Sequence, residues 1–102
     1  MSVNFKGYST IGTNNKEASE IFYDAVLAQL EPKKLLANDR ITMWLSPDDG
    51  SVLLAIAIPY DGESANHGNG TMKAIALESH DEVIKMYNKA IEMGATDDGA
   101  PG

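Results

Sequence analysis

Hydrophobic and polar positions follow two different periodicities along this chain. Apolar side chains that recur every three to four residues are typical of an amphipathic helix, whereas strict alternation or a short unbroken apolar run indicates a strand. Both patterns occur within 102 residues, which is one domain's worth of chain. The pattern therefore predicts a single small domain that mixes helices and strands.

Two stretches have the helical spacing. "TNNKEASEIFYDAVLAQL" (13–30) contains Asn14 and Asn15, either of which can cap the helix start, and a proline follows its end. "ESHDEVIKMYNKAIEMG" (78–94) begins with the capping box of Ser79 and Glu82 and ends at Gly94. Their apolar stripes comprise Ala18, Ile21, Phe22, Ala25 and Leu30 in the first helix and Val83, Tyr87 and Ala90 in the second.

Four further stretches have the character of strands, and "KLLAN" (34–38) is a candidate for a short one. "YSTIG" (8–12) and "TMKAIAL" (71–77) are short and rich in apolar or β-branched residues. "RITMWLS" (40–46) alternates, which places Met43 on one face and Trp44 on the other. "SVLLAIAIP" (51–59) is nearly all apolar, as expected of a central strand covered on both faces.

The two helical stretches are related by an internal repeat. Aligning Tyr23 with Tyr87 gives an offset of 87 − 23 = 64 residues. The same offset pairs Ile11 with Ile75, Asn15 with Ser79, Phe22 with Met86, Val26 with Ala90 and Leu27 with Ile91. Each copy opens with a strand and a helix, but the second copy stops at Gly102, opposite Asn38, before the strongest strands of the first. This pattern predicts a second copy that lacks its last strands.

The segments "IGTNNKEASEIFYDAVLAQL" and "GNGTMKAIALESHDEVIKMYNKAIEMGATDDGAPG" resemble the glyoxalase/bleomycin-resistance/extradiol-dioxygenase superfamily, the vicinal oxygen chelate proteins. Members of that family are built from two βαβββ modules in tandem. The resemblance therefore implies an α+β fold in one glyoxalase-like domain, with a first βαβββ module in residues 1–62. A partial second module, a strand and a helix, would occupy residues 63–102 of a C-terminally truncated member.

The same resemblance locates the positions that hold a divalent metal ion in metallated members. Tyr8 stands where the first strand usually carries His or Gln, and Met72 stands where the second module usually opens with His. Residues 52–58 contain no Asp, Glu or His, and the remaining Glu comes from a strand that this chain lacks. A phenol and a thioether do not replace imidazole and carboxylate ligands. We therefore expect no metal and no other cofactor in the family's site.

Charge and composition exclude several partners and chemistries. The formal net charge is −7, from 15 acidic and 8 basic residues, and Arg40 is the only arginine. Nucleic acids and anionic membranes are therefore disfavoured as partners. The chain has no cysteine, which rules out disulfides and thiolate catalysis. It also shows no signal-peptide pattern and no apolar run of membrane length, so the expected location is the cytoplasm.

The candidate ligand-binding residues are mostly aromatic or apolar. Trp44 on its alternating strand could face a concave sheet surface with Tyr8, Tyr60 and Met72, although core packing explains Trp44 equally well. His67 in "SANHGNG" would lie beside the cleft, but a catalytic histidine needs a partner acid or base and none is evident. We therefore identify no catalytic residue.

These observations favour a non-catalytic protein that binds or sequesters a small molecule. The alternatives are a metal-dependent enzyme of the glyoxalase or dioxygenase type, and a vestigial domain that acts only in assembly. Without further strands, an apolar sheet face and the edge of strand 71–77 would stay uncovered. We therefore expect a two-fold symmetric homodimer, with residues 95–102 either disordered or laid across the neighbouring chain.

Overall fold

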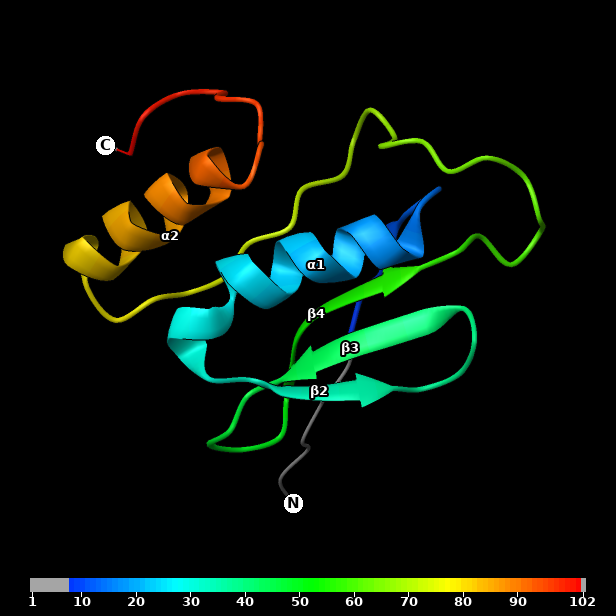
Figure 1. The fold of residues 1–102 in the computed structure, drawn as a ribbon, viewed down its shortest axis with the longest axis horizontal. Coiled ribbons are helices and arrows are strands. Elements are labelled where there is room, and N and C mark those ends of the chain that lie inside the picture. Colours follow the sequence, from blue (N-terminus) through cyan, green and yellow to red (C-terminus); the bar gives the residue numbers. More distant parts are fainter. Residues whose placement is uncertain (1–7, 102) are drawn as a thin grey trace, which may run out of the picture.

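The computed structural model describes residues 8–101 of the chain. Its elements, in chain order, are β1 (Ile11–Gly12), α1 (Lys16–Val26), the short 3-10 helix η1 (Ala28–Leu30), β2 (Lys33–Leu36), β3 (Ile41–Leu45), β4 (Val52–Ala57) and α2 (His80–Glu92). Figure 1 shows this βαβββ unit followed by the second helix. The predicted α+β class is therefore confirmed. Within the described residues, no helix is both long enough and apolar enough to cross a membrane.

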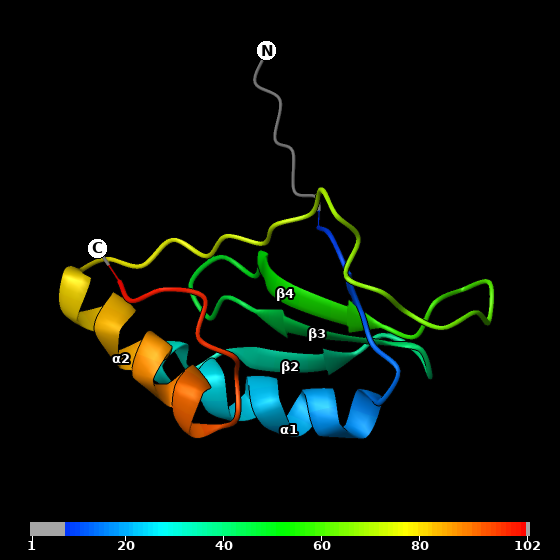
Figure 2. The same cartoon turned by 90° about the horizontal axis from the view of Figure 1, so that it is seen from above.

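The four strands form one mixed sheet in the order β1-β4-β3-β2. β1 runs parallel to β4, whereas β2, β3 and β4 are antiparallel neighbours. The register shifts between Trp44 and Leu45, so that Leu53 of β4 is skipped in the pairing. Figure 2 shows α1 lying against one face of this sheet, which leaves the opposite face without a helix among the described residues.

The face of the sheet beneath α1 carries the hydrophobic core, formed by Leu27, Trp44, Leu54 and Ile56. Trp44 has 1% of its surface exposed and donates from Nε1 to Asp24 Oδ1 at 2.9 Å. Thr42 Oγ1 donates to Glu20 Oε1 at 2.8 Å. The predicted alternation of β3 is confirmed. The face that carries Thr42 and Trp44 is buried under α1, because carboxylates of the helix accept hydrogen bonds from the hydroxyl and the indole N–H.

The opposite face is less exposed than the sequence suggested. Met43 and Ala57 each have 8% of their surface exposed, and Ala55 is fully buried. Leu35 of the edge strand β2, which pairs with Met43, is 45% exposed. The apolar surface that reaches water on this face therefore lies toward the sheet edge rather than across its centre.

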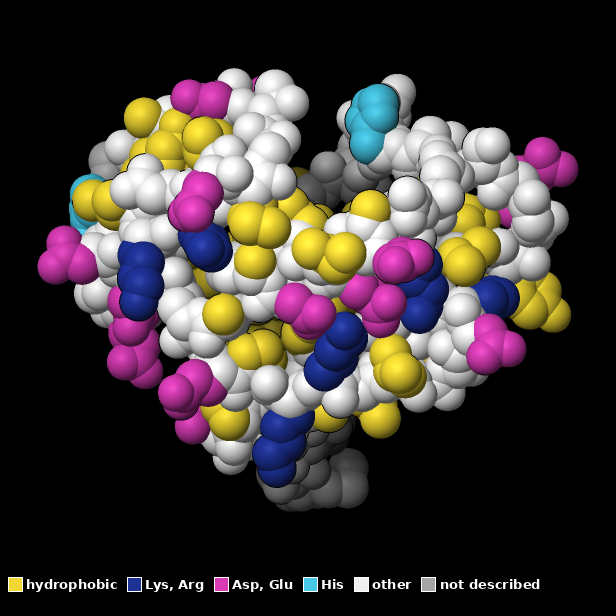
Figure 3. All heavy atoms as spheres, viewed as in Figure 1, with side chains coloured by type: hydrophobic (Ala, Val, Ile, Leu, Met, Phe, Trp, Pro, Cys, Tyr) yellow, Lys and Arg dark blue, Asp and Glu magenta, His cyan; other side chains and the backbone are white. Residues whose placement is uncertain are grey.

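Helix α2 shows apolar side chains to solvent along its length. Val83, Ile84 and Ile91 are 41%, 39% and 37% exposed, respectively. Figure 3 shows hydrophobic side chains at the surface in the region that α2 occupies in Figure 1. Met86 packs against the core, and Gln29 Nε2 donates to the carbonyl oxygen of Glu82 at 3.0 Å, which ties α2 to η1. The helix is thus anchored along one side only.

The start of α1 separates the two asparagines that could cap it. Asn15 is the cap, because its Oδ1 accepts from the backbone N–H of Ala18 at 3.0 Å. Asn14 instead bonds the backbone of Ala65 in both directions: its Nδ2 donates to the carbonyl oxygen at 3.0 Å, and its Oδ1 accepts from the N–H at 2.7 Å. Asn14 therefore links β1 to a loop far along the chain.

Both predicted ends of α2 are confirmed. Ser79 Oγ accepts from the backbone N–H of Glu82 at 3.2 Å. At the other end, Gly94 has φ +105, its N–H donates to Ile91, and the N–H of Ala95 donates to the carbonyl oxygen of Ala90. These two bonds form a Schellman motif, which requires a residue that adopts positive φ easily.

The tail after α2 turns back onto its own helix. Asp97 accepts from the N–H of Gly99 at 2.8 Å and interacts with the hydroxyl of Tyr87. Both contacts stabilise the carboxylate and lower the pKa of Asp97. The hydrogen bond between Asp97 and the Tyr87 hydroxyl raises the pKa of Tyr87. The tail was expected to be disordered or laid across a neighbouring chain. Its described part contacts its own helix, and packing against a neighbour stays a prediction. Gly102 lies outside the described residues.

The segment 71–77 was expected to be a strand, and it forms no strand in the structure. It runs beside the start of the chain, where Lys73 Nζ donates to Ser9 Oγ at 3.2 Å, and Ile75 packs against the core together with Ile11. A strand is defined by its hydrogen-bonded neighbours, and β1, at the edge of the sheet, is only two residues long. The composition of 71–77 was that of a strand, but among the described residues it forms no backbone ladder with β1 or with any other strand.

Candidate functional site

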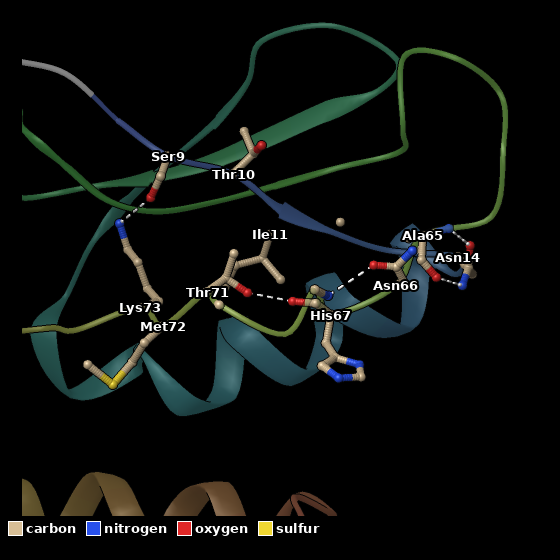
Figure 4. A pocket seen from close by; sticks show the side chains of 13 residues that line it. Ser9, Thr10, Ile11, Asn14, Ala65, Asn66, His67, Thr71, Met72 and Lys73 are labelled. Carbon is tan, nitrogen blue, oxygen red and sulfur yellow. Dashed lines mark hydrogen bonds between the residues drawn. The ribbon is translucent and has the colours of Figure 1, made fainter.

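An open groove with a volume of about 860 Å³ lies between β1 and the loop that follows the sheet. Residues 9–12 and Asn14 line one side, and residues 65–68 and 70–73 line the other. Figure 4 shows the two segments running side by side, with the polar contacts that join them. The groove is therefore formed by two segments that are more than fifty residues apart in sequence, as the separations of their contacts show.

Two features hold the loop against β1, and a third closes a turn within the loop. Asn14 bonds both backbone groups of Ala65, which substitutes for a strand pairing at this point. A Cβ built on Gly12 would lie 3.1 Å from the Cβ of Ala65, so the close approach of the two segments depends on glycine. Further along, Asn66 Oδ1 accepts from the N–H of Gly68 at 2.9 Å and closes a tight turn. The far wall is thus positioned by hydrogen bonds between side chains and the backbone and by a close approach at Gly12, rather than by a sheet.

The groove differs in charge from the protein as a whole. The chain carries a formal net charge of −7, yet the lining residues include Lys73 and His67 and contain no Asp or Glu. Lys73 Nζ donates one hydrogen bond to Ser9, and an ammonium group has two further N–H donors. The groove can therefore offer hydrogen bonds and positive charge to a ligand.

The structure brings together two of the five residues predicted to contact a ligand. His67 and Met72 both line the groove, and in Figure 4 their side chains point to the same side of the loop. Tyr8 is 54% exposed and adjoins the groove through Ser9 without lining it. Ligand contact by these residues stays a prediction.

The other two predicted residues lie elsewhere. Trp44 is buried under α1 and donates to Asp24, which is the core-packing alternative rather than the one in which it faces a ligand. The alternation of β3 was compatible with Trp44 on either face of the sheet. Trp44 lies on the face beneath α1, where Asp24 accepts its indole N–H. Tyr60 is 89% exposed, and the guanidinium carbon of Arg40 lies 4.9 Å from its ring centroid. It therefore makes a surface cation–π contact.

The family's metal positions carry unsuitable donors. Tyr8 and Met72 offer a phenol and a thioether, and Met72 is 92% exposed. Across residues 8–101, no group of three or more His, Cys, Asp or Glu side chains is placed to hold a metal ion. The residues at this site do not fit a divalent ion, so we derive no chemical step through one.

Sequence reasoning missed the contributions of Asn14 and Lys73. Asn14 was considered only as a helix cap, and Lys73 was not considered. The internal repeat contained a usable signal, because Ser9 and Lys73 are 64 residues apart, the same offset that relates the two copies. Residues equivalent in the repeat therefore meet at the groove.

The fold and the groove define a class of protein: a βαβββ module followed by a second helix, with a groove beside its first strand. The structure is similar to the crystal structure of a glyoxalase/bleomycin resistance protein from Albidiferax ferrireducens T118. The TM-score is 0.79 and the sequence identity 30%, over 92% of this chain and 74% of that chain. The chain therefore belongs to the glyoxalase/bleomycin resistance family, as the resemblance implied. Comparison with protein-family models gave no match, and comparison with curated proteins gave none either.

Proposed function

We propose that this protein binds a small molecule in the groove beside β1 and does not transform it. The observation that carries the proposal is the chemistry of the lining, which has hydrogen-bond donors and apolar side chains but no Asp, Glu or Cys. Acid–base catalysis needs a positioned pair of groups, and His67 has no carboxylate beside it in the groove. The volume of about 860 Å³ is in the range of small-molecule sites.

The same lining indicates the class of ligand. Lys73 and the hydroxyl and amide groups around it suit a carboxylate or a phosphate, because charge-assisted hydrogen bonds are the stronger ones. Ile11 and Met72 add apolar surface to the groove. We therefore propose a small organic anion with an apolar or aromatic part.

Binding of such anions should depend on Lys73. We expect some members of a panel of small carboxylates and phosphates to bind the wild-type protein and to bind Lys73→Met at least about tenfold more weakly, since a hydrogen bond to a charged group contributes about 1.5–3 kcal/mol. Isothermal titration calorimetry measures the affinities after a thermal-shift screen. Lys85→Met, which removes an exposed lysine of α2, is the matched control and should bind normally. Equal affinity in both variants would contradict the assignment of Lys73.

A metal-dependent enzyme is the alternative function within this family. Elemental analysis of the purified protein separates it from a binding protein. One equivalent of a transition metal, retained after gel filtration and lost together with a turnover activity on chelation, would replace our proposal. Recovery of every bound ligand unchanged would support it.

We further propose that the protein is a two-fold symmetric homodimer. The apolar side chains that α2 leaves in solvent support this, because exposed apolar surface on a soluble protein favours association. Assembly alone, without a ligand, is the third reading of this fold. It would be favoured if the dimer forms and no member of the ligand panel binds.

A further inference from the structure

The loop that forms the far wall of the groove contains the only Asn-Gly pair of the chain, Asn69 and Gly70. Asn69 is exposed, and it directly follows Gly68, whose φ is +66. Within the described part of the chain, neither the Asn69 amide nor the Gly70 N–H takes part in a hydrogen bond. A Cβ built on Gly70 would have no heavy atom within 4 Å, so the space around the pair is open.

This combination places a nucleophile next to an electrophile. The backbone nitrogen of Gly70 can attack Cγ of Asn69 once it loses its proton. A C–N bond forms, the carboxamide C–N bond breaks, and ammonia leaves, which produces a five-membered succinimide. Water then opens the ring at either carbonyl and yields aspartate or isoaspartate. The net reaction consumes one water and releases one ammonia, and it needs no oxidant, reductant or cofactor.

The local structure favours this reaction at Asn69 over the other asparagines near the groove. Ring closure requires the side chain to turn onto the following backbone nitrogen, and a glycine there has no side chain to hinder it. Asn14 is held by two hydrogen bonds to Ala65, and Asn66 accepts from Gly68. Asn15 caps α1 through Ala18. Each of these amides would have to break a hydrogen bond before it could react.

We propose that Asn69 is a self-modification site, which converts to aspartate or isoaspartate without an enzyme. The product places a carboxylate between Gly68 and Gly70, two residues that line the groove. Its sign opposes that of Lys73 on the same wall. The modification itself does not depend on the proposed function. Its consequence does, because a new negative charge at the rim weakens binding of an organic anion only if the groove binds one.

Peptide mass spectrometry of the full-length protein tests the modification. After incubation at mildly alkaline pH, we expect the peptide that contains Asn69 to show conversion of the amide to the acid as paired aspartate and isoaspartate products, with ammonia released. Peptides with Asn14, Asn15 and Asn66 should stay unchanged over the same period. The rate should rise with pH, because the deprotonated backbone nitrogen is the nucleophile.

Gly70→Ala is the matched variant. Gly70 has open space for a methyl group and does not adopt a positive φ, so the fold should tolerate the change. We expect the rate to fall at least about tenfold, equivalent to a barrier about 1.4 kcal/mol higher. A rate equal to that of the wild type, or faster reaction at another asparagine, would overturn the proposal.

A binding measurement separates the two proposals. Asn69→Asp should bind the organic anions identified above more weakly than the wild type, whereas Asn69→Gln should bind them equally. If deamidation occurs at Asn69 but Asn69→Asp binds equally well, the modification site stands and the anion-binding function of the groove fails. If Asn69 does not deamidate, the proposed modification site is wrong. The proposed anion binding in the groove is then tested only by the affinity of Lys73→Met.

Discussion

Trp44→Ala is expected to lower the free energy of unfolding by about 3–5 kcal/mol, the range found when a large aromatic side chain is removed from a core. Trp44 is 1% exposed and packs with Leu27, Leu54 and Ile56. Domains of this size are stable by only about 5–15 kcal/mol, so the variant should lose a large part of its stability and unfold at a much lower urea concentration than the wild type. Urea unfolding followed by far-UV circular dichroism measures the lost stability. Tryptophan fluorescence cannot be used for this variant, because Trp44 is the only tryptophan.

Trp44→Phe separates the packing of the ring from its hydrogen bond. Phenylalanine keeps most of the buried apolar surface but cannot donate to Asp24, whose carboxylate keeps its contact with Lys34 at 3.0 Å. We expect a loss of about 1.5–3 kcal/mol, the usual contribution of a hydrogen bond to a charged group. A Trp44→Ala variant as stable as the wild type would show that Trp44 is not part of the core, and would return it to the candidate ligand contacts.

The sequence predicted those elements whose ends are marked by local chemistry. Ser79 begins α2 and Gly94 ends it, and each acts through hydrogen bonds to residues close by in the sequence. The sequence pattern alone was therefore sufficient to predict both ends of the helix. The segment 71–77 failed for the opposite reason. Strand formation depends on a neighbour elsewhere in the chain, and no property of "TMKAIAL" indicates whether that neighbour is present.

The same distinction applies to the groove. His67 was identified because it lies in a glycine-rich loop, which is a local signal. For Trp44 the sequence left core packing and ligand contact open, because the direction of an alternating strand depends on the helix that packs on it. Here Asp24 and Glu20 on α1 satisfy the polar atoms of the buried face. Asn14 joins Ala65 across 51 residues, a contact that only the fold reveals.

The internal repeat allows the exposed face of α2 to be compared with a covered equivalent. Leu27, which follows α1, is 1% exposed under the packing of helix and sheet, whereas its repeat equivalent Ile91 is 37% exposed. Tyr23 packs against the core, whereas its equivalent Tyr87 bonds Asp97 of the tail. The positions that bury α1 against a sheet are thus apolar in α2 too, although no sheet of the described residues covers them. A second copy of the chain can supply the missing cover.

Sedimentation at micromolar concentration should therefore show a homodimer that Ile91→Lys converts to monomer. Burying about 800 Å² per partner, at about 25 cal/mol per Å² of apolar surface, is sufficient to offset the entropy lost on association. A lysine in place of Ile91 on that surface should cost at least about 2 kcal/mol, or roughly thirtyfold in the dissociation constant. Ile21→Lys is the matched control: Ile21 is 59% exposed on α1, and its repeat equivalent is already Lys85. That variant should remain a dimer, and a wild-type protein that sediments as a monomer at this concentration would exclude the assembly.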